Sequence, residues 1–186
     1  MENTSVGMIR HNFENIPTHP VSTPFTLRTY RPGDEKAWLK IHLRADPFNS
    51  FNEESFYKGF GRDEQLWREN QFYVCDENHQ PVGTATAWSV QKDDYPGPQG
   101  LVHWVALHPE FQGRGLSKPL MSAVCTRLKD RNFERAFLST SSGRLPAVAL
   151  YLAFGFVPYL RKPEERLAWA HIRKALGPRA IGLEAF

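Results

Sequence analysis

Residues 101–128, LVHWVALHPEFQGRGLSKPLMSAVCTRL, join a strand pattern, a glycine-bearing turn and a helix pattern in one stretch. Leu101 to Leu107 is apolar and rich in branched and aromatic residues, which predicts a buried strand that ends at His108 and Pro109. From Leu116 onward, apolar residues recur at every fourth position, which predicts an amphipathic helix. The hydrophobic period therefore changes from strand to helix across the turn.

The turn itself, Gln112-Gly113-Arg114-Gly115-Leu116-Ser117, is suited to hold a phosphate or pyrophosphate group. Its glycines let the main chain curl with N–H groups pointing inward, and a helix N-terminus with free amides and a positive dipole end follows. A plain tight connection is the alternative interpretation. Two other phosphate motifs are excluded, because the stretch has neither a Gly-Lys-Ser/Thr ending nor a G-x-G-x-x-G pattern.

This stretch resembles the acyl-CoA motif of the GNAT N-acetyltransferase superfamily, which reads Gln or Arg, two residues, Gly, one residue, then Gly or Ala. Gln112 and Gly115 match that motif, and residues 106–111, ALHPEF, are similar to the family's strand end and HPE-aromatic turn. Ser117 departs from the motif, since Gly or Ala is usual there, although serine is small and can cap a helix.

A second segment strengthens the resemblance. Residues 144–156, RLPAVALYLAFGF, are similar to the family pattern A-x-x-L-Y-x-x-x-G-F, a helix followed by glycine and a strand. Pro146 suits the first turn of that helix and Gly155 its C-terminal stop. The resemblance covers residues 27–159 and implies a GNAT-like α/β fold, with a mixed twisted β-sheet flanked by helices.

The resemblance also implies a set of site residues and acetyl-CoA as co-substrate, with no metal. Main-chain amides near Ala106 and Leu107 would bind the thioester oxygen and the pantetheine arm, and residues 112–117 would hold the pyrophosphate. Tyr151 stands where many members carry a general acid, and a phenol with a pKa of about 10 stays protonated at neutral pH. Packing beneath the sheet is the alternative for Tyr151.

His103 interrupts an otherwise apolar strand, where burying an imidazole costs free energy unless it has a partner. Its place resembles that of a histidine that acts as a base, through water, in a member of the family. An imidazole with a pKa of about 6.5 can accept a proton from the attacking ammonium group at neutral pH. A structural histidine is the alternative.

The composition indicates a soluble globular protein. The net charge of +3 is too small and too dispersed for a nucleic-acid partner, and no apolar run has the length of a membrane span. Cys75 and Cys125 fit buried free thiols in a reducing compartment, so we expect a cytoplasmic protein. A length of 186 residues suits one domain, which we expect over residues 25–186 after an N-terminal arm of residues 1–24.

The remaining patterns predict further elements. Asp34 is expected to cap a helix, and two helices are expected at residues 53–60 and 62–69, where aromatic side chains either line an acceptor pocket or pack against the sheet. A helix is also predicted from residue 162 to Leu176, followed only by residues 180–186 for an edge strand. Further strands are predicted at residues 25–31, 72–76, 81–90, 136–140 and 156–160.

These patterns favour an acetyl-CoA-dependent N-acetyltransferase, in which a small-molecule or peptide primary amine attacks the thioester directly. A non-catalytic acyl-CoA sensor or scaffold is the alternative from another class, and a longer acyl donor is the alternative within the same chemistry. The identity of the amine is not encoded in any motif, and a monomer and a homodimer both stay open.

Overall fold

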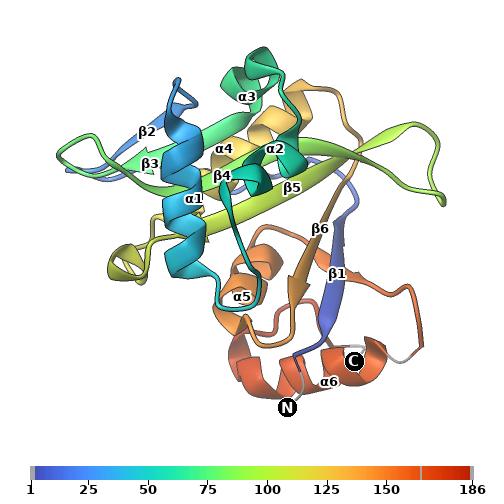
Figure 1. The fold of residues 1–186 in the computed structure, drawn as a ribbon. Helices are drawn as coiled ribbons and strands as arrows, with labels where there is room; N and C mark the ends of the chain where they lie inside the picture. Colours follow the sequence, from blue (N-terminus) through green and yellow to red (C-terminus); the bar gives the residue numbers. More distant parts are fainter. Residues whose placement is uncertain (1–2, 164, 185–186) are drawn as a thin grey trace. The chain divides into compact units, whose positions relative to one another are not determined.

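The computed structural model describes residues 3–163 and 165–184, which form a mixed α/β fold with a seven-stranded sheet (Figure 1). The strands are β1 Ser5–Arg10, β2 Thr26–Thr29, β3 Gln71–Cys75, β4 Pro81–Gln91, β5 Pro98–Leu107, β6 Ala136–Ser141 and β7 Val157–Tyr159. The helices are α1 Asp34–Ala45, α2 Glu53–Phe60, α3 Glu64–Asn70, α4 Ser117–Asp130, α5 Leu145–Ala153 and α6 Glu165–Leu176, with short 3-10 turns at Pro109–Phe111 and Gly177–Arg179.

The strands pair in the order β2-β3-β4-β5-β6-β1-β7. Strands β5 and β6 run parallel, whereas β1 is antiparallel to both β6 and β7, and β3 is antiparallel to both β2 and β4. The predicted mixed sheet flanked by helices is therefore confirmed. The chain divides into two units, and each is described by itself. Unit 1 holds the described residues of 1–17, 89–101 and 129–186, and unit 2 holds residues 18–88 and 102–128.

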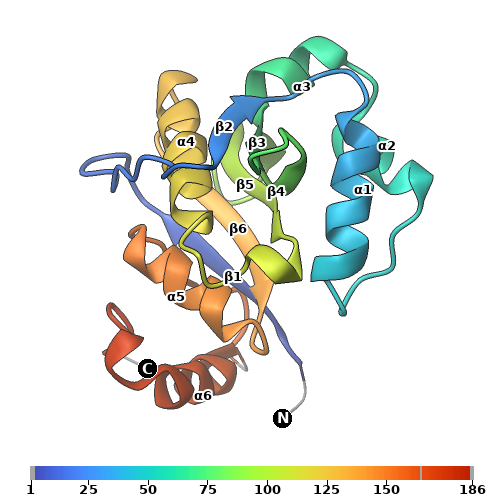
Figure 2. The ribbon, with the colours of Figure 1, turned by 90° about the vertical axis from the view of Figure 1, so that its left-hand side faces the viewer.

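In unit 2, helices cover both faces of the strands. Helices α1 and α2 lie side by side on one face, and α4 lies on the other (Figure 2). The face under α1 and α2 is packed with aromatic side chains: Tyr30, Trp38, Phe56, Phe60, Trp67 and Tyr73 are all buried in one cluster. Burial of such rings contributes much of the free energy of folding, since each removes a large apolar area from water.

The start of α1 differs from the prediction. Asp34 was expected as the N-cap, but Gly33 holds that position with a φ of 98°, and its lack of a side chain leaves the cap without a side-chain hydrogen bond. The Asp34 carboxylate instead accepts a hydrogen bond from the Arg31 N–H at 2.6 Å and pairs with the Arg28 guanidinium at 2.6 Å. The carboxylate therefore joins β2 to the first turn of α1, where a negative charge also favours the helix dipole.

In unit 1, the prediction of an N-terminal arm over residues 1–24 is wrong for its first part, which contains a strand. Ser5–Arg10 form β1, which pairs with β6 on one side and β7 on the other, so the strand is internal to the sheet. Its last five residues are all buried, which gives a continuous run instead of the alternation that identifies a half-exposed strand. The run is short and contains Gly7, and for that reason its sequence carries no strand signal. The boundary of a single domain at residue 25 stays a prediction.

The C-terminal prediction is confirmed in part. Helix α6 forms and ends at Leu176, before Gly177 and Pro178. Residues 180–184 contain no strand, and residues 185–186 lie outside the described residues. Both cysteines are buried thiols outside any disulfide, as predicted. Among the described residues, no helix has the length and apolar character that crossing a membrane requires.

Candidate active site

The bend between β5 and α4 has the conformation that its glycines predict. Gly113 has a φ of 76° and Gly115 a φ of 78°, values that residues with a side chain rarely adopt. A Cβ at either position would meet no heavy atom within 4 Å, so the main-chain conformation and not crowding requires glycine. The Gln112 side chain holds the start of the bend by donating a hydrogen bond from Nε2 to the Leu107 carbonyl at 3.1 Å.

The bend presents unpaired main-chain donors. Within residues 3–163 and 165–184, the five N–H groups from Gly113 to Ser117 have no hydrogen-bond acceptor, and the first paired amide is Lys118, which donates to the Gly115 carbonyl at 3.2 Å. The positive end of the 14-residue helix α4 follows directly. The Arg114 guanidinium is held 5.1 Å from the centre of the Phe111 ring, within the bend. This arrangement is suited to binding an anion such as a diphosphate.

Strand β5 has an irregularity that sequence reasoning missed. Trp104 has a φ of 49°, in the left-handed region, which is unfavourable for a bulky side chain and interrupts the regular geometry of the strand. Such strain costs on the order of 1–3 kcal/mol and concentrates at functional sites. Further along, a Cβ on Gly83 of β4 would lie 2.2 Å from Leu107 Cδ2 and 3.2 Å from the Ala106 carbonyl oxygen, so β4 approaches the predicted thioester-binding residues closely. No feature of the sequence signals the strain at Trp104.

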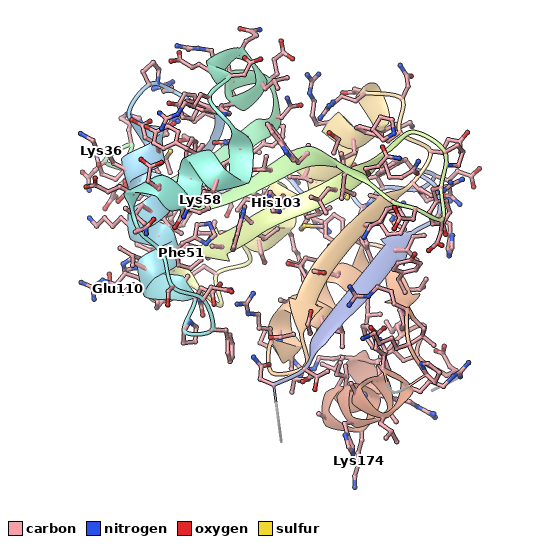
Figure 3. All side chains as sticks on the ribbon, turned by 45° about the vertical axis from the view of Figure 1, so that its right-hand side comes forward. Lys36, Phe51, Lys58, His103, Glu110 and Lys174 are labelled. Carbon is pink, nitrogen blue, oxygen red and sulfur yellow. The ribbon has the colours of Figure 1, made fainter. Side chains whose placement is uncertain are left out.

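His103 lies one residue before that irregularity and projects from β5 toward α2, on the side where Phe51 also lies (Figure 3). Its ring packs edge-on against Phe60 at a centroid distance of 5.5 Å and lies 5.3 Å from the Trp104 ring. Burial lowers the pKa of His103 to about 4, because the charged imidazolium loses hydration. Among the described residues, the imidazole has no hydrogen-bond partner, and its nitrogens are not among the fully enclosed atoms. The ring is therefore neutral at pH 7, with open nitrogen atoms.

The aromatic residues of the segment 48–67 mostly pack. Phe56, Phe60 and Trp67 are buried in the cluster under α1 and α2, whereas Phe48 is 48% exposed. His42 of α1 lies within the same cluster, 4.1 Å from the Trp38 ring and 5.1 Å from the Phe51 ring. These aromatic side chains were expected either to line an acceptor pocket or to pack against the sheet, and the three buried rings pack.

Tyr151 lies on α5, in unit 1, whereas His103, Ala106, Leu107 and residues 112–117 lie in unit 2. Burial raises the pKa of Tyr151 to about 12, while the nearby Arg144 charge acts weakly in the opposite direction. Within the described part of the chain, its hydroxyl has no hydrogen-bond partner, and the oxygen is not among the fully enclosed polar atoms. The Tyr151 ring is therefore buried, and its hydroxyl is protonated and able to donate a hydrogen bond.

The loop between β4 and β5 is held by its own contacts. Asp94 accepts a hydrogen bond from the Tyr159 hydroxyl at 2.7 Å, and this bond is the main reason that the pKa of Tyr159 rises to about 12. Among the described residues, no three His, Cys, Asp or Glu side chains are grouped as a metal site would require.

Comparisons with known proteins show which protein family this chain is similar to. A family model described as "Acetyltransferase (GNAT) family" matches residues 36–156. A mycothiol acetyltransferase from Thermobifida fusca is 30% identical over an alignment of 162 residues, and the alignment covers 78% of this chain and 50% of that protein. A mycothiol acetyltransferase from Salinispora arenicola is 31% identical over an alignment of 150 residues, and the alignment covers 76% of this chain and 47% of that protein. The chain spans about half the length of these relatives.

Solved structures show the same fold. A GCN5-related N-acetyltransferase from Sphaerobacter thermophilus gives a TM-score of 0.68 at 19% identity, over 84% of this chain and 48% of that chain. The ribosomal-protein-S18-alanine N-acetyltransferase from Escherichia coli gives a TM-score of 0.55 at 21% identity, over 70% of this chain and 76% of that chain.

Proposed function

Because the chain belongs to the GNAT acetyltransferase family, we propose that it transfers an acetyl group from acetyl-CoA to a primary amine, which attacks the thioester directly. The observation that carries this proposal is the bend at Gly113–Ser117. Its five N–H groups have no acceptor within the described residues, and it opens onto the positive end of α4. A diphosphate supplies the acceptors that these donors lack.

The same proposal assigns the thioester to the end of β5. Main-chain amides near Ala106 and Leu107 would bind the thioester oxygen and stabilise the negative charge that develops on it in the tetrahedral intermediate. The strained main chain at Trp104 supports this assignment, because an irregularity in a strand disturbs the regular ladder of hydrogen bonds beside it. Arg114 and Lys118 would add positive charge beside the phosphates.

In this proposal, a water molecule near His103 accepts the proton that the attacking amine loses. A pKa of about 4 makes the imidazole a weak base, so it does not hold the proton at neutral pH and instead passes it to solvent. Tyr151 is assigned to the departing thiolate. A phenol with a pKa of about 12 is a much weaker acid than a thiol, so we expect it to stabilise the thiolate by donating a hydrogen bond, without full proton transfer.

The names of the relatives support one class of acceptor. Two of them carry the name mycothiol acetyltransferase, which favours a small thiol-sugar amine as the first acceptor to test. Polyamines, aminoglycosides, amino acids and protein N-termini are the competing classes. A cytoplasmic location belongs to the same proposal, and the two buried cysteines, which form no disulfide, support it because cytoplasmic thiols stay reduced.

The test is a panel assay with acetyl-CoA and one amine of each class, including cysteinyl-glucosamine, spermidine, kanamycin, alanine amide and an alanine-led peptide. Free CoA is measured by chromatography and the acetylated amine by mass spectrometry, since thiol reagents would react with thiol-bearing acceptors. Tyr151→Phe should lower kcat by about 100-fold or more while leaving the Kd of acetyl-CoA unchanged.

Two outcomes would contradict the proposal. Tight binding of acetyl-CoA without CoA release for any amine would favour the sensor alternative. Higher turnover with propionyl-CoA or hexanoyl-CoA than with acetyl-CoA would favour the longer donor. Full activity of Tyr151→Phe would remove Tyr151 from the mechanism without affecting the assignment of the bend.

A further inference from the structure

Arg10, the last residue of β1, is a buried cation that holds the C-terminal turn of α5. Its side chain belongs to unit 1 and is nearly enclosed, with 5% of the residue exposed. The guanidinium donates from Nη1 to the Phe154 carbonyl, from Nη2 to the Glu14 carbonyl and from Nε to the Asn12 carbonyl at 2.8 Å. A buried guanidinium loses hydration, and these carbonyls replace the lost water with hydrogen bonds.

The close approach of Arg10 depends on Gly155. A Cβ at residue 155 would lie 2.5 Å from Arg10 Nη1, which is closer than Cβ atoms approach non-bonded atoms in proteins. Gly155 also has a φ of 76°, which ends α5. The glycine of the family-like segment therefore serves two purposes here, since it stops the helix and admits the guanidinium against the helix end.

The turn that Arg10 holds is the one that fixes Tyr151. The Tyr151 carbonyl accepts hydrogen bonds from the Phe154 N–H at 3.1 Å and from the Phe156 N–H at 3.0 Å. The Tyr151 ring also packs edge-on against the Phe156 ring at a centroid distance of 6.3 Å. Arg10 donates to the carbonyl of Phe154, so it holds the same turn that contacts the main chain and the ring of Tyr151.

We propose that Arg10 is a positioning residue for the Tyr151 hydroxyl, and that strand β1 therefore takes part in the chemistry although it lies outside the family match at residues 36–156. A positive charge at the C-terminal end of α5 also favours the helix dipole, so the helix is held by charge as well as by hydrogen bonds. This inference rests on the role proposed for Tyr151. A displacement of about 1 Å at a reacting group can lower a rate by about 100-fold.

The first test needs no acceptor. The protein is labelled with 3-fluorotyrosine at its six tyrosines, and the fluorine resonance of Tyr151 is identified by its loss in Tyr151→Phe. Arg10→Lys and Arg10→Ala should shift or broaden that resonance. Arg28→Met is the matched control, because it breaks another well-formed arginine contact, the 2.6 Å pair with Asp34, and should leave the Tyr151 resonance in place.

Chemical rescue sharpens this test. A surface cavity of about 420 Å³, lined by Arg10, Asn12, Phe154 and Gly155 among others, gives small cations access to the site. Guanidinium at low millimolar concentration should restore the Tyr151 resonance of Arg10→Ala, whereas methylammonium should restore it less, since it lacks the planar set of donors. An unmoved Tyr151 resonance in both Arg10 variants would overturn the inference.

The second test is a kinetic cycle with acetyl-CoA and the amines of the panel above. Arg10→Lys should lower kcat about 10-fold in the wild-type background and less than about 2-fold in the Tyr151→Phe background, with the KM of acetyl-CoA unchanged in both. Arg28→Met should lower kcat by the same factor in both backgrounds. An equal effect of Arg10→Lys in both backgrounds would refute the inference while leaving the proposed function intact. A fully active Tyr151→Phe would remove the role of Tyr151 and the inference together.

Discussion

At the scale of the residue, the lack of a side chain at Gly59 leaves space beside the His103 imidazole. Gly59 lies in the last turn of α2, where glycine is less favourable than alanine by up to about 1 kcal/mol. A Cβ at this position would lie 3.0 Å from Trp104 Nε1 and 3.9 Å from His103 Nε2. The glycine is therefore explained by the close approach of α2 to the strained part of β5, and the lack of a side chain leaves the imidazole open.

We predict that Gly59→Ala will lower kcat without the gain in stability that alanine normally brings to a helix. The added methyl group crowds Trp104 and covers His103, so we expect a several-fold lower kcat with an unchanged Kd for acetyl-CoA. Urea unfolding and panel kinetics measure both effects. Lys58→Ala, at an exposed position of the same helix, controls for helix propensity. A stabilisation of about 1 kcal/mol with normal kinetics in Gly59→Ala would show that this contact has no functional role.

At the scale of the element, we propose that the bend and α4 act together as one anion-binding site. The glycines set the curl, Gln112 ties the start of the bend to the end of β5, and the helix supplies the positive end of its dipole. Each part is local in the chain, and each would lose its effect without the others.

We predict that Gly115→Ala will weaken acetyl-CoA binding by about 10-fold or more, because a side chain at a φ of 78° forces the main-chain amides out of their arrangement. Calorimetry measures the affinity directly. Gly97→Ala is the matched control, since Gly97 also has a positive φ, 67°, and would also place its Cβ in open space. Both variants should lose about 1–2 kcal/mol of stability, but only Gly115→Ala should lose affinity. Equal affinities would contradict the assignment of the bend.

At the scale of the whole molecule, the half-buried imidazole of His103 links stability to pH. Its pKa of about 4 in the folded state is below the value of about 6.5 expected in the unfolded chain, so the unfolded chain binds the proton more readily between these values. Proton uptake by His103 in the unfolded chain therefore does not lower the stability of the protein above about pH 6.5. It lowers the stability progressively as the pH falls toward 4.

We predict that the wild-type protein will lose more stability than His103→Gln between pH 7 and pH 4, by at most about 3 kcal/mol. Urea unfolding at several pH values, at constant ionic strength, measures the difference. The kcat/KM profile provides an independent check, because His103 should contribute no inflection near pH 6.5. An inflection there that disappears in His103→Gln would show that the imidazole titrates normally.

The sequence by itself determined the parts of the protein that are local in the chain. The β5-bend-α4 unit, the 53–60 helix, the α5 helix with its glycine stop, and α6 were all predicted, because turn glycines, caps and hydrophobic periods act between neighbouring residues. The family resemblance came from two such local segments, and the family match confirms it.

Only the tertiary structure decided the features that depend on residues far apart in the sequence. Strand β1 is recognisable only once β6 and β7 pair with it, and Arg10 meets a carbonyl 144 positions away. The low pKa of His103 and the strained main chain of Trp104 likewise arise from the layers packed around them. Burial, strain and long-range hydrogen bonds are properties of the packed chain, and no window of sequence contains them.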